Sequence, residues 1–190
     1  MSNTQKTVYI ALLAAQATVI SVFEGMLPQL LAFAPGAKLG LANIITMVAI
    51  FTLSDKDSFK VVIMRILLST LIGGTLSTFL YGFSGTILSF FGMILIRRLG
   101  PSKVSFIGIS AAGGILFNVG QLIVASTIAG SATIMLYLPI LSISGIIAGI
   151  LVGICGNFMM ENVATIKRMQ SEEAKNSSLS KKWYEASLSN

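Results

Sequence analysis

The stretch LPILSISGIIAGILVGICGNFMME, residues 138–161, decides the fold class of this chain. It carries no charged residue before Glu161 and is long enough to cross the hydrocarbon core of a bilayer, which takes roughly 20 apolar helical residues. Glycine recurs within it at Gly145, Gly149 and Gly153. Small residues on one helix face let membrane helices approach closely. The stretch therefore predicts a membrane-spanning helix that packs tightly against a neighbour.

Apolar segments of this kind fill the chain from about residue 8 to residue 160. Of the 190 residues, 54% are hydrophobic and 11% are charged, and the mean hydropathy is +0.86. Soluble domains carry about 25% charged residues. We therefore expect an all-α integral membrane protein built as a bundle of six transmembrane helices. The expected spans are residues 7–26, 39–54, 60–81, 84–98, 105–129 and 138–161.

Glycine, proline and charged residues punctuate the connections between these spans. The first connection is long and contains Pro28 and Pro35, and a tight turn is expected at residues 82–85, which begin and end with glycine. Residues 1–161 form the expected membrane domain. Residues 162–190 are low in apolar content, so we expect a cytoplasmic polar tail that is partly disordered.

The distribution of lysine and arginine predicts the orientation of the bundle. With the N-terminus in the cytoplasm, Lys38 is the basic residue left in the outer connections, as the positive-inside rule requires. Both termini are then expected in the cytoplasm. We also expect a multi-pass protein of a plasma membrane, in a bacterium. The net charge of +6 reflects basic residues at span ends that meet anionic lipid, and it does not predict nucleic-acid binding.

Residue types that support much of enzyme chemistry are missing from the sequence. There is no histidine, and Cys155 is the single cysteine, so a disulfide within the chain and a thiolate metal site are excluded. No glycine-rich nucleotide-binding loop is present either. We expect no catalytic site, no metal and no cofactor.

Two charged residues flank the long first connection. Glu24 ends the first expected span and Lys38 opens the second, with residues 25–36 forming a re-entrant or lid-like loop between them. One interpretation is a Glu24–Lys38 ion pair that holds this loop. The other is that Lys38, near a helix N-terminus, binds an anionic group of a ligand, with Glu24 beside it.

Polar residues inside the apolar segments are the other candidates. Asn43, Asn118, Gln121 and Tyr137 could line a substrate pocket in the outer half of the bundle, or could form hydrogen bonds between helices. Arg65 could extend its side chain to the inner surface or could form an internal pairing that organises the bundle.

The first span contains ALLAA at residues 11–15, with Ala11 and Ala15 on one helix face. Together with the length, the expected spans and the long first outer loop, this motif resembles the substrate-binding S components of energy-coupling factor transporters. In that family a small-residue motif on the first helix docks against a transmembrane coupling subunit. The resemblance assigns this docking to Ala11 and Ala15.

Three further blocks give a closer resemblance that covers nearly all of residues 8–160. PGAKLGLAN at residues 35–43, RILLSTLIGGT at residues 65–75 and NVGQ at residues 118–121 are similar to blocks of the Gx transporter family, often labelled heptaprenyl diphosphate synthase component I. Members of that family commonly carry histidine before the asparagine. Phe117 stands there in this chain, which argues against a proton-handling role.

Two functions follow from these resemblances. The first is a membrane-embedded S component that captures a small, acidic and partly hydrophobic molecule, such as a vitamin-like compound or an isoprenoid or quinone precursor. Its partners would be the coupling subunit and two ATPase subunits. The second is a non-catalytic membrane partner of a prenyl diphosphate synthase. Prenyl elongation needs aspartate clusters that hold magnesium, and Asp55 and Asp57 lie instead in a short turn beside lysines.

Overall fold

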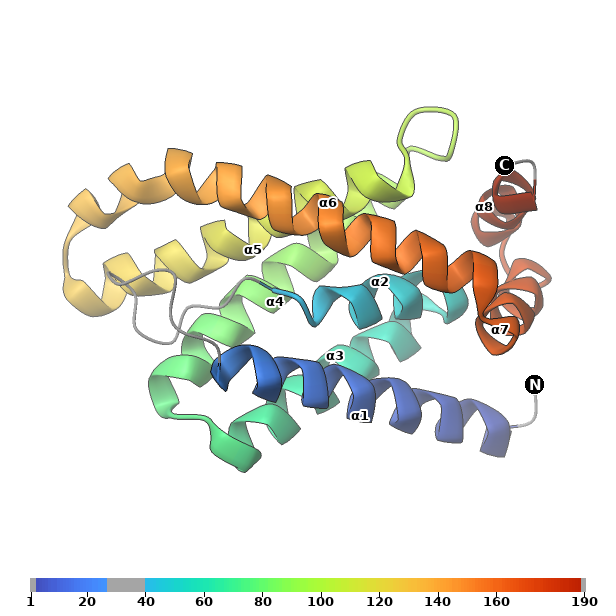
Figure 1. The fold of residues 1–190 in the computed structure, drawn as a ribbon, viewed down its shortest axis with the longest axis horizontal. Coiled ribbons are helices and arrows are strands. Elements are labelled where there is room, and N and C mark those ends of the chain that lie inside the picture. Colours follow the sequence, from blue (N-terminus) through green and yellow to red (C-terminus); the bar gives the residue numbers. More distant parts are fainter. Residues whose placement is uncertain (1–2, 27–39, 189–190) are drawn as a thin grey trace.

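The computed structural model describes residues 3–26 and 40–188, and these residues are helical without any strand. The all-α fold class is therefore confirmed. Figure 1 shows the elements in chain order. They are α1 (Asn3–Met26), α2 (Asn43–Thr52), α3 (Asp55–Gly73), α4 (Leu76–Arg97), α5 (Phe106–Ala129), the 3-10 helix η1 (Ala132–Tyr137), α6 (Leu138–Asn162), α7 (Ala164–Ala174) and α8 (Ser178–Leu188).

Four segments of the described chain are long and apolar enough to cross a membrane: α1, α4, α5 and η1 with α6. The six expected spans are thus confirmed only in part. The expected span at residues 39–54 contains α2, which has 10 residues and is about 15 Å long at 1.5 Å per residue. The next helix, α3, begins with charged residues and also contains Arg65, so it lacks the composition of the other four.

The break between α3 and α4 lies at Gly74 and Thr75, and the turn expected at residues 82–85 was wrong. Thr75 caps α4 by accepting a hydrogen bond from the Thr78 backbone N–H, and the Thr78 hydroxyl accepts one from the Thr75 N–H in return. Gly85 instead lies inside α4, where a Cβ atom would be 2.8 Å from the Phe117 carbonyl oxygen. Glycine here allows close packing of α4 on α5 and does not end a helix.

The glycines of residues 138–161 have the predicted role in close packing. A Cβ atom at Gly149 would lie 2.5 Å from Ala111 Cα, and one at Gly153 would lie 2.7 Å from Ile107 Cα. Both neighbours are backbone atoms of α5, so no side-chain movement could make room. The stretch that predicts the fold class therefore joins α6 to α5 along much of their length.

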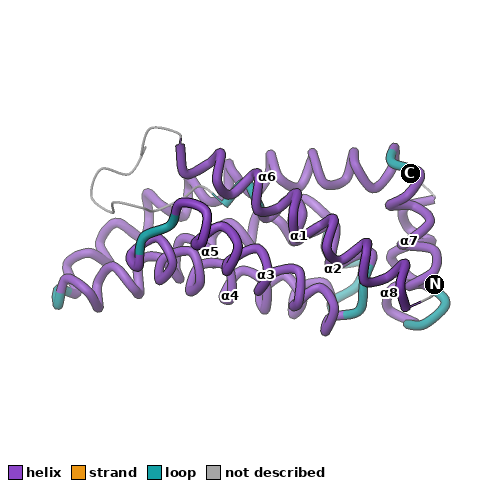
Figure 2. Tube along the Cα trace, turned by 90° about the horizontal axis from the view of Figure 1, so that it is seen from below, coloured by secondary structure: helices purple, strands orange, loops and turns teal. Residues whose placement is uncertain are grey.

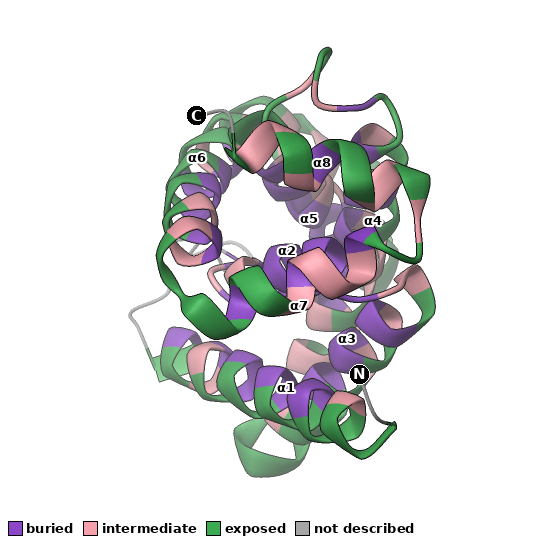
Figure 3. Ribbon diagram, turned by 90° about the vertical axis from the view of Figure 1, so that its right-hand side faces the viewer, coloured by how far each residue is buried: buried purple, intermediate pink, exposed green. Residues whose placement is uncertain are grey.

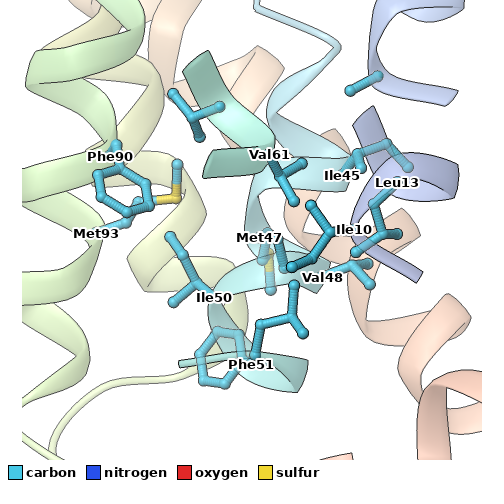
Figure 4. Packing of buried hydrophobic residues seen from close by; sticks show 14 of the residues in the cluster. Ile10, Leu13, Ile45, Met47, Val48, Ile50, Phe51, Val61, Phe90 and Met93 are labelled. Atoms are coloured by element: carbon cyan, nitrogen blue, oxygen red, sulfur yellow. The ribbon is translucent and has the colours of Figure 1, made fainter. Parts of the chain in front are cut away.

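Helix α2 lies in the middle of the bundle, as Figure 1 shows, and nine of its residues from Asn43 to Thr52 are buried. Its side chains Met47, Val48, Ile50 and Phe51 pack among residues of α1, α3 and α4 (Figure 4). A helix that is apolar on all faces is stable only inside a protein or in lipid. The short length of α2 and its burial make it the centre of the core.

The C-terminal end of α2 meets polar groups from later in the chain. The Ser58 hydroxyl donates to the Ala49 carbonyl at 2.8 Å, and the Arg97 guanidinium donates to the Ile50 carbonyl. Arg97 also forms an ion pair with Asp55 at 2.5 Å. Carbonyls in the last turn of a helix lack a partner within the helix, so Arg97 satisfies that of Ile50, whereas the Ala49 carbonyl also accepts the Leu53 N–H at 2.9 Å.

The C-terminal residues form helices, in contrast to the partly disordered tail expected from composition. Helices α7 and α8 cover one end of the bundle, the end at which both termini lie (Figures 1 and 3). Trp183 of α8 is buried against Phe51 and Phe106, and its indole N–H donates to the Arg97 carbonyl at 3.1 Å. One buried aromatic side chain thus attaches the tail to the core. Figure 2 shows the same arrangement from below, with α7 and α8 beside the N-terminus.

An acidic side chain organises charges at this same end. Asp57 forms ion pairs with Lys6 of α1 and with Lys60 at 2.8 Å, and it accepts a hydrogen bond from the Ser54 hydroxyl at 2.6 Å. Burial alone would raise the pKa of the Asp57 carboxyl. The lysines and Ser54 outweigh burial and hold its pKa well below the ordinary value of 3.8.

Replacing Gly149 by alanine tests the α5–α6 contact. The added methyl group would meet α5 backbone atoms, and we expect a loss of about 1–3 kcal/mol in the free energy of unfolding. The measurement is thermal unfolding of the purified protein in detergent. Gly108→Ala is the matched control, because its Cβ would lie 3.4 Å from the Ser105 Oγ, an ordinary contact. Equal melting temperatures for the two variants would contradict this assignment.

The lowered pKa of Asp57 predicts a pH dependence of stability. A carboxyl group whose folded-state pKa is lowered stabilises the protein above its unfolded pKa, and this contribution is lost as pH falls through the folded-state pKa. We therefore expect Asp57→Asn to lower the melting temperature at pH 7, and the difference from the wild type to shrink as pH falls below about 4. Glu185→Gln, at the exposed surface, serves as the control. A difference that stays constant down to pH 3 would disprove the assignment.

Candidate functional site

A cavity of about 220 Å³ lies at the end of the bundle opposite the termini. The last turns of α1, the second half of α3 and the first half of α4 form its walls, with Gly40 and Ala42 before α2 and Phe117 of α5. Hydroxyl groups and apolar side chains line it together. Its polar lining residues are Ser21, Glu24, Arg65, Ser69, Thr70, Thr78 and Thr86.

Glu24 is one of the two charged residues among the described lining, and it is 6% exposed. Its carboxylate accepts hydrogen bonds from the backbone N–H groups of Gly40, at 2.5 Å, and Leu41, at 3.2 Å. These two residues form the turn that leads into α2. A carboxylate is favoured there because a helix N-terminus carries partial positive charge. Glu24 therefore holds the start of α2 against α1.

Arg65 is the other charged lining residue, and it is 4% exposed at the middle of α3. Its guanidinium donates to the hydroxyl of Thr86 on α4 and to the hydroxyl of Thr46 on α2, the latter at 3.4 Å. Of the two interpretations of Arg65 from the sequence, the structure favours internal pairing over extension to the inner surface. A buried guanidinium that joins three helices is fixed in position beside the cavity.

The apolar part of the cavity is built around Phe117, which is 3% exposed. Gly40 lies against this ring with a φ of +88°, and a Cβ atom at Gly40 would be 3.2 Å from the ring. A residue other than glycine would thus be strained by its backbone conformation and crowded by Phe117. The block PGAKLGLAN needs glycine at this position to bring the start of α2 to the cavity.

Asn43 lies behind Gly40 and outside the cavity lining. Its side chain is 4% exposed, and its amide nitrogen donates to the Ser89 hydroxyl at 3.4 Å. Its side-chain oxygen has no hydrogen-bond partner among the described residues. The expected substrate contact of Asn43 stays a prediction.

Asn118 and Gln121 lie on one face of α5, as predicted, and Asn118 contacts α6. Asn118 donates to the Leu141 carbonyl at 2.7 Å and is near the Ser144 hydroxyl, and Gln121 donates to the Asn118 side-chain oxygen at 3.4 Å. This matches the second interpretation, hydrogen bonding between helices. Neither residue lines the cavity.

The remaining residues predicted for binding or docking lie away from the cavity or outside the described residues. Tyr137, at the end of η1, is 44% exposed and is not part of the cavity lining. Lys38 lies outside the described residues, so its expected role stays a prediction. Ala11 and Ala15 are exposed on α1, on the side that also presents Val8 and Leu12.

The threonines that hold Arg65 were not among the residues predicted for the site. Thr46 and Thr86 are 1% exposed, and neither stands out in a chain rich in small polar residues. The signal that could have found them is Arg65 itself, because a buried guanidinium requires acceptors on neighbouring helices. Among the described residues, no group of three metal-ligating side chains comes together.

The family model described as heptaprenyl diphosphate synthase component I matches residues 13–159, more than half of the 190 residues. The chain belongs to this family. The match confirms the resemblance carried by the blocks at residues 35–43, 65–75 and 118–121, and it includes every element that lines the cavity. Comparison with curated proteins and with solved structures found no match.

Substituting Glu24 by glutamine tests its role in positioning α2. The amide keeps one oxygen acceptor but places an N–H₂ group against a backbone donor, so we expect a loss of about 1–3 kcal/mol in the free energy of unfolding. Thermal unfolding in detergent measures it. Glu185→Gln, at an exposed ion pair, should change stability by less than about 1 kcal/mol. Similar melting temperatures for both variants would show that Glu24 does not hold α2.

Proposed function

We propose that this protein is the substrate-binding component of an ATP-driven importer of the energy-coupling factor type, in a bacterial plasma membrane. It would capture a small, acidic and partly hydrophobic molecule from outside the cell. A vitamin-like compound or an isoprenoid or quinone precursor has this chemistry. A coupling subunit and two ATPase subunits would supply the energy, and the chain itself would have no catalytic role.

The observation that carries the proposal is the cavity with two charged side chains beside helices long enough to cross a membrane. Charged residues buried beside such segments are costly and generally mark a binding site or transport pathway. Glu24 and Arg65 are both nearly inaccessible, and a cavity of about 220 Å³ lies between their helices among the residues that the structure describes. The cavity lies at the end opposite Lys6 and Arg97, which the positive-inside rule assigns to the cytoplasm, so its expected access is from outside.

The exposed face of α1 supports the proposed docking. Ala11 and Ala15 are exposed there beside Val8, which is 62% exposed, and Leu12, which is 51% exposed. Small residues on an apolar helix face allow a second membrane helix to approach closely. A coupling subunit would use this face while leaving the cavity untouched.

Enlarging these alanines tests the docking. We expect Ala11→Leu with Ala15→Leu to abolish copurification with an ATPase-containing complex, because the added side chains separate the two helices. The measurement is native mass spectrometry of the gently extracted complex. Ile147→Phe, a substitution at a 57% exposed position of α6, is the control. Undiminished association of the double variant would contradict docking through α1.

The family name supports the alternative, a non-catalytic membrane partner of a prenyl diphosphate synthase. The same experiment separates the two functions. Copurification with a soluble prenyltransferase and without ATPase subunits would favour the synthase partner. Copurification with ATPase subunits would favour the importer.

A further inference from the structure

We propose that Arg65 binds the acidic group of the substrate, and that the substrate is a small organic anion with a compact apolar body. This inference rests on the proposed function, which places the substrate in the cavity. It assigns a ligand contact to a residue that the sequence analysis considered only for the architecture of the bundle.

The hydrogen bonds of Arg65 leave donors for a ligand. A guanidinium has five N–H donors in a planar fork. Among the described residues, Arg65 donates to two threonine hydroxyls, Thr46 and Thr86, and these acceptors are neutral. Its planar fork therefore keeps donors for an anionic group, and a carboxylate matches this geometry with two parallel hydrogen bonds.

The Arg65 guanidinium has one charged neighbour in the described lining, the Glu24 carboxylate, which compensates part of its charge. A buried cation is costly unless an opposite charge lies close to it. Glu24 lies in the same cavity, and its carboxylate also accepts the Gly40 and Leu41 N–H groups at the start of α2. An acidic ligand that contacts Arg65 would compensate its charge directly. The hydroxyl of Thr86, already fixed by Arg65, lies in the same lining.

The size and lining of the cavity limit the rest of the ligand. Its volume of about 220 Å³ is below the roughly 300–1,000 Å³ of pockets that hold drug-sized molecules. Phe117 and Ile66 are buried apolar side chains that face this space beside Arg65. A ring or short aliphatic group would fit against them. A long prenyl chain would not fit within the described walls.

The test uses benzoate as the probe and benzamide as its neutral counterpart of similar shape. Binding to the full chain in lipid nanodiscs is measured by saturation-transfer NMR titration. We expect the wild type to bind benzoate at least tenfold more tightly than benzamide. Arg65→Gln should remove this preference, and Arg65→Lys should keep part of it, because lysine retains the charge without the planar fork. Arg168→Gln, at an exposed arginine of α7, should leave the preference unchanged.

A second variant tests the location independently of Arg65. Thr78, Gly82 and Thr86 lie one turn apart on the cavity side of α4, and a Cβ atom at Gly82 would have no neighbour within 4 Å. Gly82→Leu should therefore fill the cavity without disturbing the helices and abolish benzoate binding. Gly108→Leu is the matched control at an exposed position. These two variants decide the location even if Arg65→Gln does not fold.

The outcomes separate this inference from the proposed function. Equal binding of benzoate and benzamide, with both lost in Gly82→Leu, would overturn the role of Arg65 while supporting a ligand site in the cavity. A benzoate preference that persists in Arg65→Gln would also overturn it. Absence of benzoate binding, or binding unaffected by Gly82→Leu, would overturn the inference in the same way. The importer function would then be tested separately, by association with the ATPase subunits.

Discussion

Helix α2 is buried on nearly all sides but is too short to cross a membrane, so both of its ends must find polar partners inside the protein. The Glu24 carboxylate accepts from the turn that precedes the helix. Arg97 and Ser58 donate to the carbonyls of its last turn. The negative charge is at the N-terminal end and the positive charge at the C-terminal end, which matches the helix dipole. Helices α1, α3 and α4 are thereby held around one short segment.

The short length and burial of α2 also determine where the cavity lies. Helix α2 begins partway along the bundle, so α1, α3 and α4 extend beyond its first residue. They enclose a space that no side chain of α2 fills. Arg65 reaches Thr46 near the first turn of α2 and Thr86 on α4, so the guanidinium lies at the boundary between packed core and open space. Glu24 lies at the same boundary from α1. Glu24 and Arg65, whose charges are costly in lipid, therefore both hold neighbouring helices together and line the candidate site.

Hydropathy and small-residue patterns predicted the helical class, four of the long segments and the packing role of Gly149 and Gly153, because these depend on composition and spacing alone. They could not predict that α2 is short, since its apolar sequence is equally typical of a full span. The turn expected at residues 82–85 was wrong because glycine is typical of turns, whereas Gly85 allows a close contact between α4 and α5 inside a helix. For the site, Glu24 lines the cavity and Asn118 and Gln121 do not, and the substrate contacts expected of all three stay predictions. The pattern of buried amides could not place the cavity, because an amide is satisfied equally well by a neighbouring helix and by a ligand.

Trp183 lies between Phe51 and Phe106 and donates to the carbonyl of Arg97, the residue that supports the end of α2. This contact has a consequence for biogenesis. Helix α8 leaves the ribosome after α1 to α7, and until then the aromatic site on Phe51 is incomplete. Helix α2 is too short for independent insertion, so it must be kept with its neighbours during that interval. We therefore expect assembly of the bundle to finish only after α8 has been synthesised, with α8 closing the end of the bundle at which α7 lies.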